Sequence, residues 1–304
     1  MKAKFFATLL LTFTLPFSVH ASEKLKVVAS FSILGDMVKN VASDDVELKI
    51  LVGANGDAHE YQPTPADAKA ISKADLVIVN GLGFEGWLPR LVKSSGYKGT
   101  VLEASKGISS LFLSEKTEKG EPHHHEHDGK DPHAWQNLAN GKIYVKNIRD
   151  ALIAADKAHA DDYRKNAKEY LKKLDDAEIF VKSELAKIPT QKRKLVTTHD
   201  AFAYFAKAYN VEFLAAQGIS TEGQPTAADV AKLIDQIRTQ KVTTIFLENM
   251  TDSRLIKQLE KDAGAKLGGT LYSDALSAEN EPAPNYIAMF KHNVSALVSA
   301  LMGK

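Results

Sequence analysis

Apolar and polar residues divide the chain into two kinds of segment. Short runs rich in Val, Ile and Leu alternate with longer stretches in which apolar residues recur at helical spacing. The short runs predict strands at residues 25–31, 46–52, 74–80, 100–104, 194–198, 211–215, 243–247 and 267–272. Strands that alternate with helices in this way are typical of parallel sheets covered by helices on both faces.

The helical stretches lie between these strands and at the end of the chain. They are expected at residues 33–42, from Pro65 onward, and at residues 201–209, 226–240, 252–263 and 284–302. Proline is well tolerated in a first helical turn, and Thr226 is of a residue type that caps helices.

One stretch is longer than the others. Residues 142–188 are rich in Ala, Lys, Glu and Leu and contain neither Gly nor Pro, so they predict helix throughout, with a break allowed at residues 154–159. We therefore expect an α/β fold in which two α/β lobes with parallel sheets are joined by a long rigid helix. The N-terminal lobe would span residues 22–141, the linking helix 142–188 and the C-terminal lobe 189–304.

The first residues have the pattern of a secretory signal. A basic start with Lys2 and Lys4 precedes an apolar run over residues 5–17, and small residues follow up to Ala21. This pattern predicts a signal peptide over residues 1–21 and export to the periplasm. The chain contains no cysteine, so we expect a core without disulfides and a mature protein that carries no lipid on a leader cysteine.

Composition narrows the classes of function. The 304 residues are 44% hydrophobic and 25% charged, and the formal net charge is +1. A nucleic-acid-binding protein would need a strong basic excess, so that class is excluded. The chain is expected to be a monomer.

Ligand-type side chains follow several predicted strands. His59 comes after the strand at 46–52, His199 ends the one at 194–198, Asp274 follows the one at 267–272, and His133 follows a polar loop. Ligands of open parallel sheets bind beyond the carboxyl ends of the strands. Each residue taken singly fits an ordinary surface or capping role, but together they place two candidate ligands on each lobe, facing one cleft.

Three imidazoles and one carboxylate suit zinc and the neighbouring transition metals. Four protein ligands would close a tetrahedral shell and leave no position for a catalytic water, which favours binding over catalysis.

Two further motifs have weaker implications. The polar segment 121–130 carries His123, His124, His125 and His127, which favours weak metal capture over a merely polar linker. Residues 81–86 match G-x-G-x-x-G after a strand. An exported chain has little use for a dinucleotide, so we interpret these glycines as a tight turn.

At these residues the chain resembles the zinc- and manganese-binding solute-binding proteins of bacterial ABC transporters, the cluster A-I family. The resemblance covers the mature chain and is strongest in residues 57–67, 73–83, 131–135, 197–205, 246–249 and 271–276. It implies two lobes, a rigid interlobe helix, and a metal held by His59, His133, His199 and Asp274. It also implies delivery of the metal to an ABC permease.

The resemblance bears on the metal as well. Manganese-type members usually carry Glu where this chain has His199, and many dedicated zinc members have a longer His-rich loop. We therefore expect a periplasmic zinc-binding transport protein, Zn²⁺ being the cargo and Mn²⁺ the alternative. The competing hypotheses are a manganese- or iron-specific protein of the same family, a periplasmic zinc hydrolase with Glu60 or Glu248 as base, and a zinc chaperone.

Overall fold

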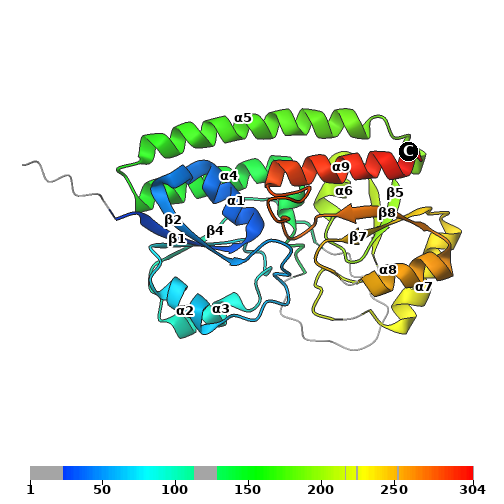
Figure 1. Cartoon of the computed structure of the whole chain (residues 1–304), viewed down its shortest axis with the longest axis horizontal. Helices are drawn as coiled ribbons and strands as arrows, with labels where there is room; N and C mark the ends of the chain where they lie inside the picture. Colours follow the sequence, from blue (N-terminus) through cyan, green and yellow to red (C-terminus); the bar gives the residue numbers. More distant parts are fainter. Residues whose placement is uncertain (1–22, 113–128, 216, 224, 252, 304) are drawn as a thin grey trace, which may run out of the picture.

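The structure is a computed structural model that describes residues 23–303, apart from residues 113–128, 216, 224 and 252. Two α/β lobes lie side by side, and one long helix runs along both of them (Figure 1). The expected signal peptide lies outside the described residues, and so do all four histidines of the 121–130 segment.

The N-terminal lobe is built on a parallel sheet of four strands in the order β2-β1-β3-β4. The strands are β1 (Leu25–Phe31), β2 (Val46–Val52), β3 (Leu76–Val79) and β4 (Thr100–Glu103). Its helices are α1 (Ser32–Ala42), α2 (Pro65–Ser72), α3 (Leu88–Ser95) and α4 (Leu138–Ala155). Helices α1 and α4 cover one face of the sheet, and α2 and α3 lie on the other (Figure 1).

The C-terminal lobe repeats this strand arrangement in the order β6-β5-β7-β8. Its strands are β5 (Lys194–Thr197), β6 (Glu212–Ala215), β7 (Thr244–Glu248) and β8 (Lys266–Leu271). Its helices are α6 (Ala203–Tyr209), α7 (Ala227–Thr239), α8 (Ser253–Ala263) and α9 (Tyr286–Met302). All pairings in both sheets are parallel, as the strand pattern predicted.

The helix expected over residues 142–188 is divided in the structure. Helix α4 ends at Ala155, and α5 (Ala160–Leu185) begins after a corner. The Asp156 carboxylate stabilises this corner, because it accepts hydrogen bonds from the Ala158 amide (3.0 Å) and the Tyr163 hydroxyl (2.9 Å) and lies 2.6 Å from His159 Nδ1. Helix α4 therefore covers the N-terminal lobe, and α5 alone links the two lobes.

Three short 3-10 helices complete the described elements: η1 (Ser43–Asp45), η2 (Ala134–Gln136) and η3 (Thr190–Lys192). Among the described residues, none of the helices combines the length and the apolar character needed to cross a bilayer.

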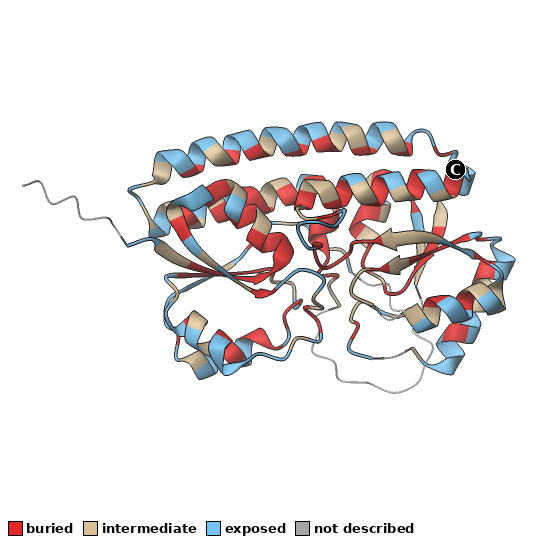
Figure 2. Ribbon diagram, in the orientation of Figure 1, coloured by how far each residue is buried: buried red, intermediate tan, exposed pale blue. Residues whose placement is uncertain are grey.

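Buried apolar side chains form two clusters of unequal size. The larger one fills the N-terminal lobe and continues along α5 into α6, α9 and the end of β8 at Leu271. The smaller one lies wholly within the C-terminal lobe, under α7 and α8. In Figure 2 the buried positions of α5 and α9 form stripes that face inward, as expected of amphipathic helices. The main core therefore does not stop at the boundary between the lobes.

Candidate metal centre

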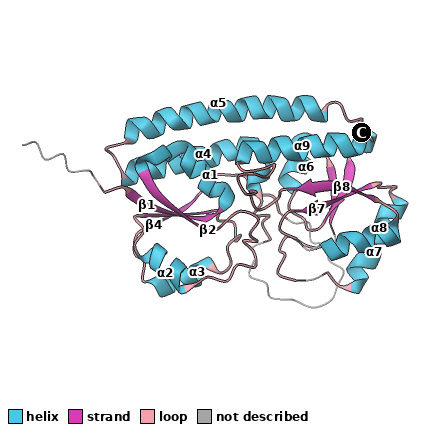
Figure 3. Cartoon of the chain, viewed as in Figure 1, coloured by secondary structure: helices cyan, strands magenta, loops and turns pink. Residues whose placement is uncertain are grey.

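The four candidate ligands lie on loops that meet between the lobes (Figure 3). His59 is in the loop between β2 and α2, and His133 immediately precedes η2. His199 follows the end of β5, and Asp274 follows the end of β8. Each lobe thus contributes two side chains.

Their donor atoms form a small cage, all within 4.8 Å of one another. His59 Nε2 lies 3.3 Å from both His133 Nε2 and Asp274 Oδ2. Asp274 Oδ2 is 3.0 Å from His199 Nε2, and Asp274 Oδ1 is 3.6 Å from His133 Nε2. A zinc tetrahedron with bonds of about 2.1 Å has edges of about 3.4 Å. The cage therefore has the size of a four-coordinate metal site.

The cage is also buried and contains unsatisfied polar atoms. His133, His199 and Asp274 are fully buried, and His59 is 5% exposed. Asp274 Oδ2 and His199 Nε2 lie 3.0 Å apart, but within the described part of the chain neither atom, nor Asp274 Oδ1, makes a hydrogen bond. Buried polar atoms are nearly always satisfied, so these atoms fit a site whose remaining partner is a cation.

Each of the three histidines is anchored through its backbone by a carboxylate. The His59 amide donates to Asp57 Oδ1 (2.8 Å), and the His133 amide donates to Asp131 Oδ1 (2.9 Å). The His199 amide donates to Oε1 of Glu248 (2.9 Å). Glu248 is the last residue of β7, which pairs with β5. These hydrogen bonds fix the loops from which the imidazoles project.

Two of these carboxylates also hold the imidazole rings. Asp131 Oδ1 lies 2.8 Å from Nδ1 of His133, and Glu248 Oε2 lies 2.7 Å from Nδ1 of His199. A carboxylate at Nδ1 directs the lone pair of Nε2 toward the metal and raises the basicity of the ligand. The Asp57 carboxylate makes no such contact with the His59 ring in the described structure.

The charges in the cage shift the pKa values of its members in opposite directions. Burial opposes protonation of His133, but the charge of Asp274 and the hydrogen bond with Asp131 outweigh it and raise its pKa to about 9. Burial alone would raise the pKa of Asp274, yet the imidazoles of His133 and His199 hold it well below its usual range. Burial lowers the pKa of His59. A dication that enters the cage therefore displaces protons.

The loop that carries Asp274 is tied firmly to the N-terminal lobe. The carbonyl of Ser273 accepts hydrogen bonds from Trp135 Nε1 (2.9 Å) and Gln136 Nε2 (2.7 Å). Farther along, the Leu276 amide donates to Ser32 Oγ (2.9 Å). Asp274 is thus held in place by the lobe opposite to its own.

The glycine-rich segment after β3 shapes one wall of the cage. Gly81, Leu82 and Gly83 all adopt positive φ, which confirms the predicted tight turn. The turn places Phe84 with its ring centroid 4.6 Å from that of His59. The ring centroid of Trp135 lies 4.7 Å from that of Phe84 and 5.2 Å from that of His133. These aromatic rings shield the cage from water.

The supporting carboxylates are not predicted from the sequence. Asp57 and Asp131 lie within the motifs at residues 57–67 and 131–135, and Glu248 is a candidate only as the base of a hydrolase. The available signal was the repeated Asp-x-His spacing at residues 57–59 and 131–133. No comparable local signal joins Glu248 to His199, which is 49 residues away.

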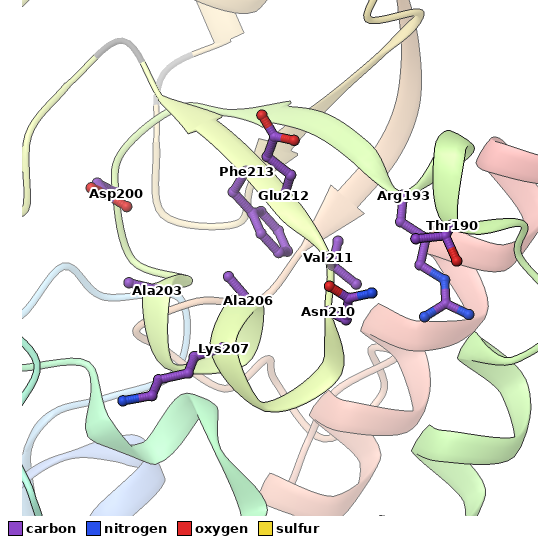
Figure 4. A pocket seen from close by; sticks show the side chains of 10 residues that line it. All are labelled: Thr190, Arg193, Asp200, Ala203, Ala206, Lys207, Asn210, Val211, Glu212 and Phe213. Carbon is purple, nitrogen blue, oxygen red and sulfur yellow. The ribbon is translucent and has the colours of Figure 1, made fainter.

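A cavity in the C-terminal lobe lies apart from the candidate ligands. It has a volume of about 470 Å³ and lies between α6 and β6 in the C-terminal lobe (Figure 4). Side chains of both charges line it, among them Arg193, Asp200 and Lys207. None of the four cage residues borders it.

Known proteins resemble this chain over nearly its whole length. It is 36% identical over 290 residues to the manganese ABC transporter substrate-binding lipoprotein PsaA of Streptococcus pneumoniae, covering 93% of this chain and 91% of the relative. It is 35% identical over 286 residues to the metal ABC transporter substrate-binding lipoprotein SsaB of Streptococcus sanguinis, covering 92% and 90%.

Solved structures show the same fold. The Mn-bound periplasmic metal-binding protein from Candidatus Liberibacter asiaticus matches with a TM-score of 0.79 and 32% identity, covering 92% of this chain and 100% of that one. The periplasmic zinc-binding protein TroA of Treponema pallidum matches with a TM-score of 0.82 and 28% identity, covering 92% and 99%.

The family described as "Zinc-uptake complex component A periplasmic" matches residues 27–300. This match spans both lobes and all four cage residues. The chain therefore belongs to this family, whose members are metal-binding, substrate-binding components of ABC transporters and not enzymes.

Proposed function

We propose that this protein captures zinc in the periplasm and delivers it to the membrane permease of an ABC transporter. The observation that carries the proposal is the cage of His59, His133, His199 and Asp274, whose donor atoms lie within 4.8 Å of one another. The test is metal analysis of untagged protein. One equivalent of zinc per chain is expected, and a preparation that binds no divalent metal tightly would refute the proposal.

Zinc rather than manganese is supported by the donor set. Three neutral imidazoles and one carboxylate suit a tetrahedral zinc ion, whereas manganese prefers oxygen-rich sites of higher coordination. Relatives of this chain are named for manganese, for metal in general and for zinc. The choice of zinc therefore rests on His199, which supplies nitrogen at a position where the manganese type is expected to supply oxygen.

The rival classes lack a supporting observation. A zinc hydrolase needs an open coordination position and a free general base. Glu248 is occupied by His199 and by the Thr198 amide, and Glu60 is exposed. A zinc chaperone without a transporter would use the same cage, so genes for a permease and an ATPase beside this one would distinguish the two.

We further propose that the mature protein is an unlipidated periplasmic monomer. The relatives named lipoproteins conflict with the unlipidated state. This sequence, however, contains no cysteine to carry a lipid. Mass spectrometry of protein from the membrane and soluble fractions would decide the question.

Loading with metal should change the overall shape little. Helix α5 packs on α1 and α4 at one end and on α9 at the other, so it resists a wide hinge motion between the lobes. Small-angle scattering curves of apo and zinc-loaded protein should therefore nearly superimpose. A clear drop in the radius of gyration on loading would contradict this expectation.

The His-rich segment should be dispensable for tight binding. Changing His123, His124, His125 and His127 to serine should leave one tight equivalent of zinc and remove weaker additional equivalents. Isothermal titration of the variant beside the parent measures both classes of site. Loss of the tight equivalent would show that this segment supplies a ligand.

A further inference from the structure

The route of the ion is not evident from the cage, because three of its four members have no exposed surface. Only His59 retains some, at 5%. A cavity of about 220 Å³ lies next to it between the lobes, lined by Asp57 and Glu60 from one side and by Thr198 and Thr221 from the other. Asp57 is two residues from His59, and Thr198 adjoins His199, so this cavity borders two of the ligands.

A single hydrogen bond closes this side of the cleft. Thr221 Oγ1 donates to Asp57 Oδ2 at 2.7 Å, and Thr221 is almost fully buried. Within the described structure this is the one hydrogen bond from residues 217–223 to the N-terminal lobe. The remaining hydrogen bonds of that segment are to its own lobe, such as the one from the Gln217 amide to the Thr198 carbonyl (3.1 Å).

The side of the cleft near Asn55 is held more strongly. The Asn55 amide donates to the Leu276 carbonyl, its side chain donates to Glu281, and Asn249 donates to its side-chain oxygen, all at 2.8 Å. Asn55 adopts a positive φ of 56° in this turn. Helices α5 and α9 run along a third side (Figure 1). Of these three sides, the Asp57–Thr221 side has the fewest hydrogen bonds between the lobes within the described residues.

Asp57 differs from the other two supporting carboxylates. All three accept the backbone amide of a ligand histidine, but Asp131 and Glu248 also contact the imidazole ring of that histidine. Asp57 instead places its second oxygen on Thr221 in the opposite lobe. One carboxylate thus connects the position of His59 to closure of the cleft.

We propose that the cavity lined by Asp57, Glu60 and Thr221 is the portal through which the metal ion enters and leaves, and that Asp57 is the positioning residue that closes it. The inference rests on the proposed function, since it presupposes an ion in the cage. Two carboxylates, those of Asp57 and Glu60, and one cation, Arg254, line the portal, so its lining carries a net negative charge that attracts a dication.

The hydrogen bond between Thr221 and Asp57, which we call the latch, is tested by the rate of metal exchange. Thr221→Val removes the hydroxyl but keeps the size of the side chain, and Ser220→Ala removes a neighbouring hydroxyl that accepts only from the Glu222 amide in its own loop. We expect Thr221→Val to release zinc into excess chelator about 10-fold faster, the size of effect that loss of a hydrogen bond to a carboxylate produces. Ser220→Ala and Thr221→Ser should release zinc at the parental rate.

The readout is stopped-flow tryptophan fluorescence, because Trp135 packs against His133. Association with Zn²⁺ should also be faster in Thr221→Val, so its affinity should change less than its release rate. Release at the parental rate, or equal acceleration in Ser220→Ala, would overturn the latch. If the parent binds one equivalent of zinc but Thr221→Val exchanges zinc at the parental rate, the portal proposal is refuted and the proposed function is retained.

The negative lining gives a second, independent test. Glu60→Gln should slow the association of Zn²⁺ at low salt, and the difference should vanish as salt is added. Glu169→Gln on α5 removes another exposed charge far from the portal and should have no effect. This pair decides the route even if Thr221→Val fails to fold. Equal association rates in the two variants would place the portal elsewhere.

Discussion

Replacing His133 or His199 by alanine should lower the affinity for zinc by more than about 100-fold, because loss of a partner that merely supports a ligand already costs 10- to 100-fold. Each change removes a donor and leaves the partner carboxylate, Asp131 or Glu248, buried without its imidazole. Competition titration against a chromogenic chelator measures the affinity. Asp274→Asn should also weaken binding strongly, since it removes a negative charge that contacts all three imidazoles.

His159→Ala is the matched control, because His159 lies at the corner between α4 and α5, where its ring contacts Asp156 and Tyr163. It should bind zinc as the parent does. A cage variant that retains parental affinity would remove that residue from the ligand set. Circular dichroism of each apo variant separates loss of the site from loss of the fold.

Changing His199 to Glu should narrow the preference for zinc over manganese, mainly by weakening zinc. The new side chain adds an oxygen donor and a negative charge, which manganese tolerates better than zinc does. It also lies where the imidazole now contacts Glu248 Oε2 at 2.7 Å, so two buried carboxylates would face each other. Competition titration of both proteins with both metals measures the ratio of affinities.

Two further variants separate these effects. His199→Gln removes the imidazole without adding charge. It should lower the affinity for zinc without shifting the ratio of the two affinities toward manganese. The double variant His199→Glu with Glu248→Gln relieves the repulsion and should recover part of the lost affinity for both metals. A parent that prefers manganese, or an unchanged ratio in His199→Glu, would show that this position does not set the selectivity.

Much of this fold could be predicted because buried parallel strands are nearly continuous apolar runs. Strand β1 is an example: its residues 27–31 are all buried, and the strand has the predicted bounds. The corner at Asp156 lies within the break allowed at residues 154–159, but its geometry could not be predicted, since Ala and Lys on either side favour helix and hydrogen bonds to the Asp156 side chain stabilise the corner. Local propensity does not report such contacts.

Strand ends predict three of the four cage residues, all but His133, but they do not predict the carboxylates that support them. His199 lies two residues after the end of β5, so the topology of a parallel sheet places it at the cleft. The pairing of Glu248 with His199 depends on β7 lying beside β5, which is a matter of strand order. Likewise, the hydrogen bond from Thr221 to Asp57 joins residues 164 positions apart, and only the packing of the lobes brings them together.

The larger hydrophobic cluster has a consequence for how the molecule loses its structure. It fills one lobe, follows α5, and includes Phe205 of α6 and Phe290 of α9 in the other. Unfolding of either lobe would therefore expose apolar surface that the other lobe now covers, and this couples the two in one cooperative transition. The two lobes are distinct in shape, but because they share a core they are expected to unfold together. Only the layer under α7 and α8, which has its own small cluster, is placed to open separately.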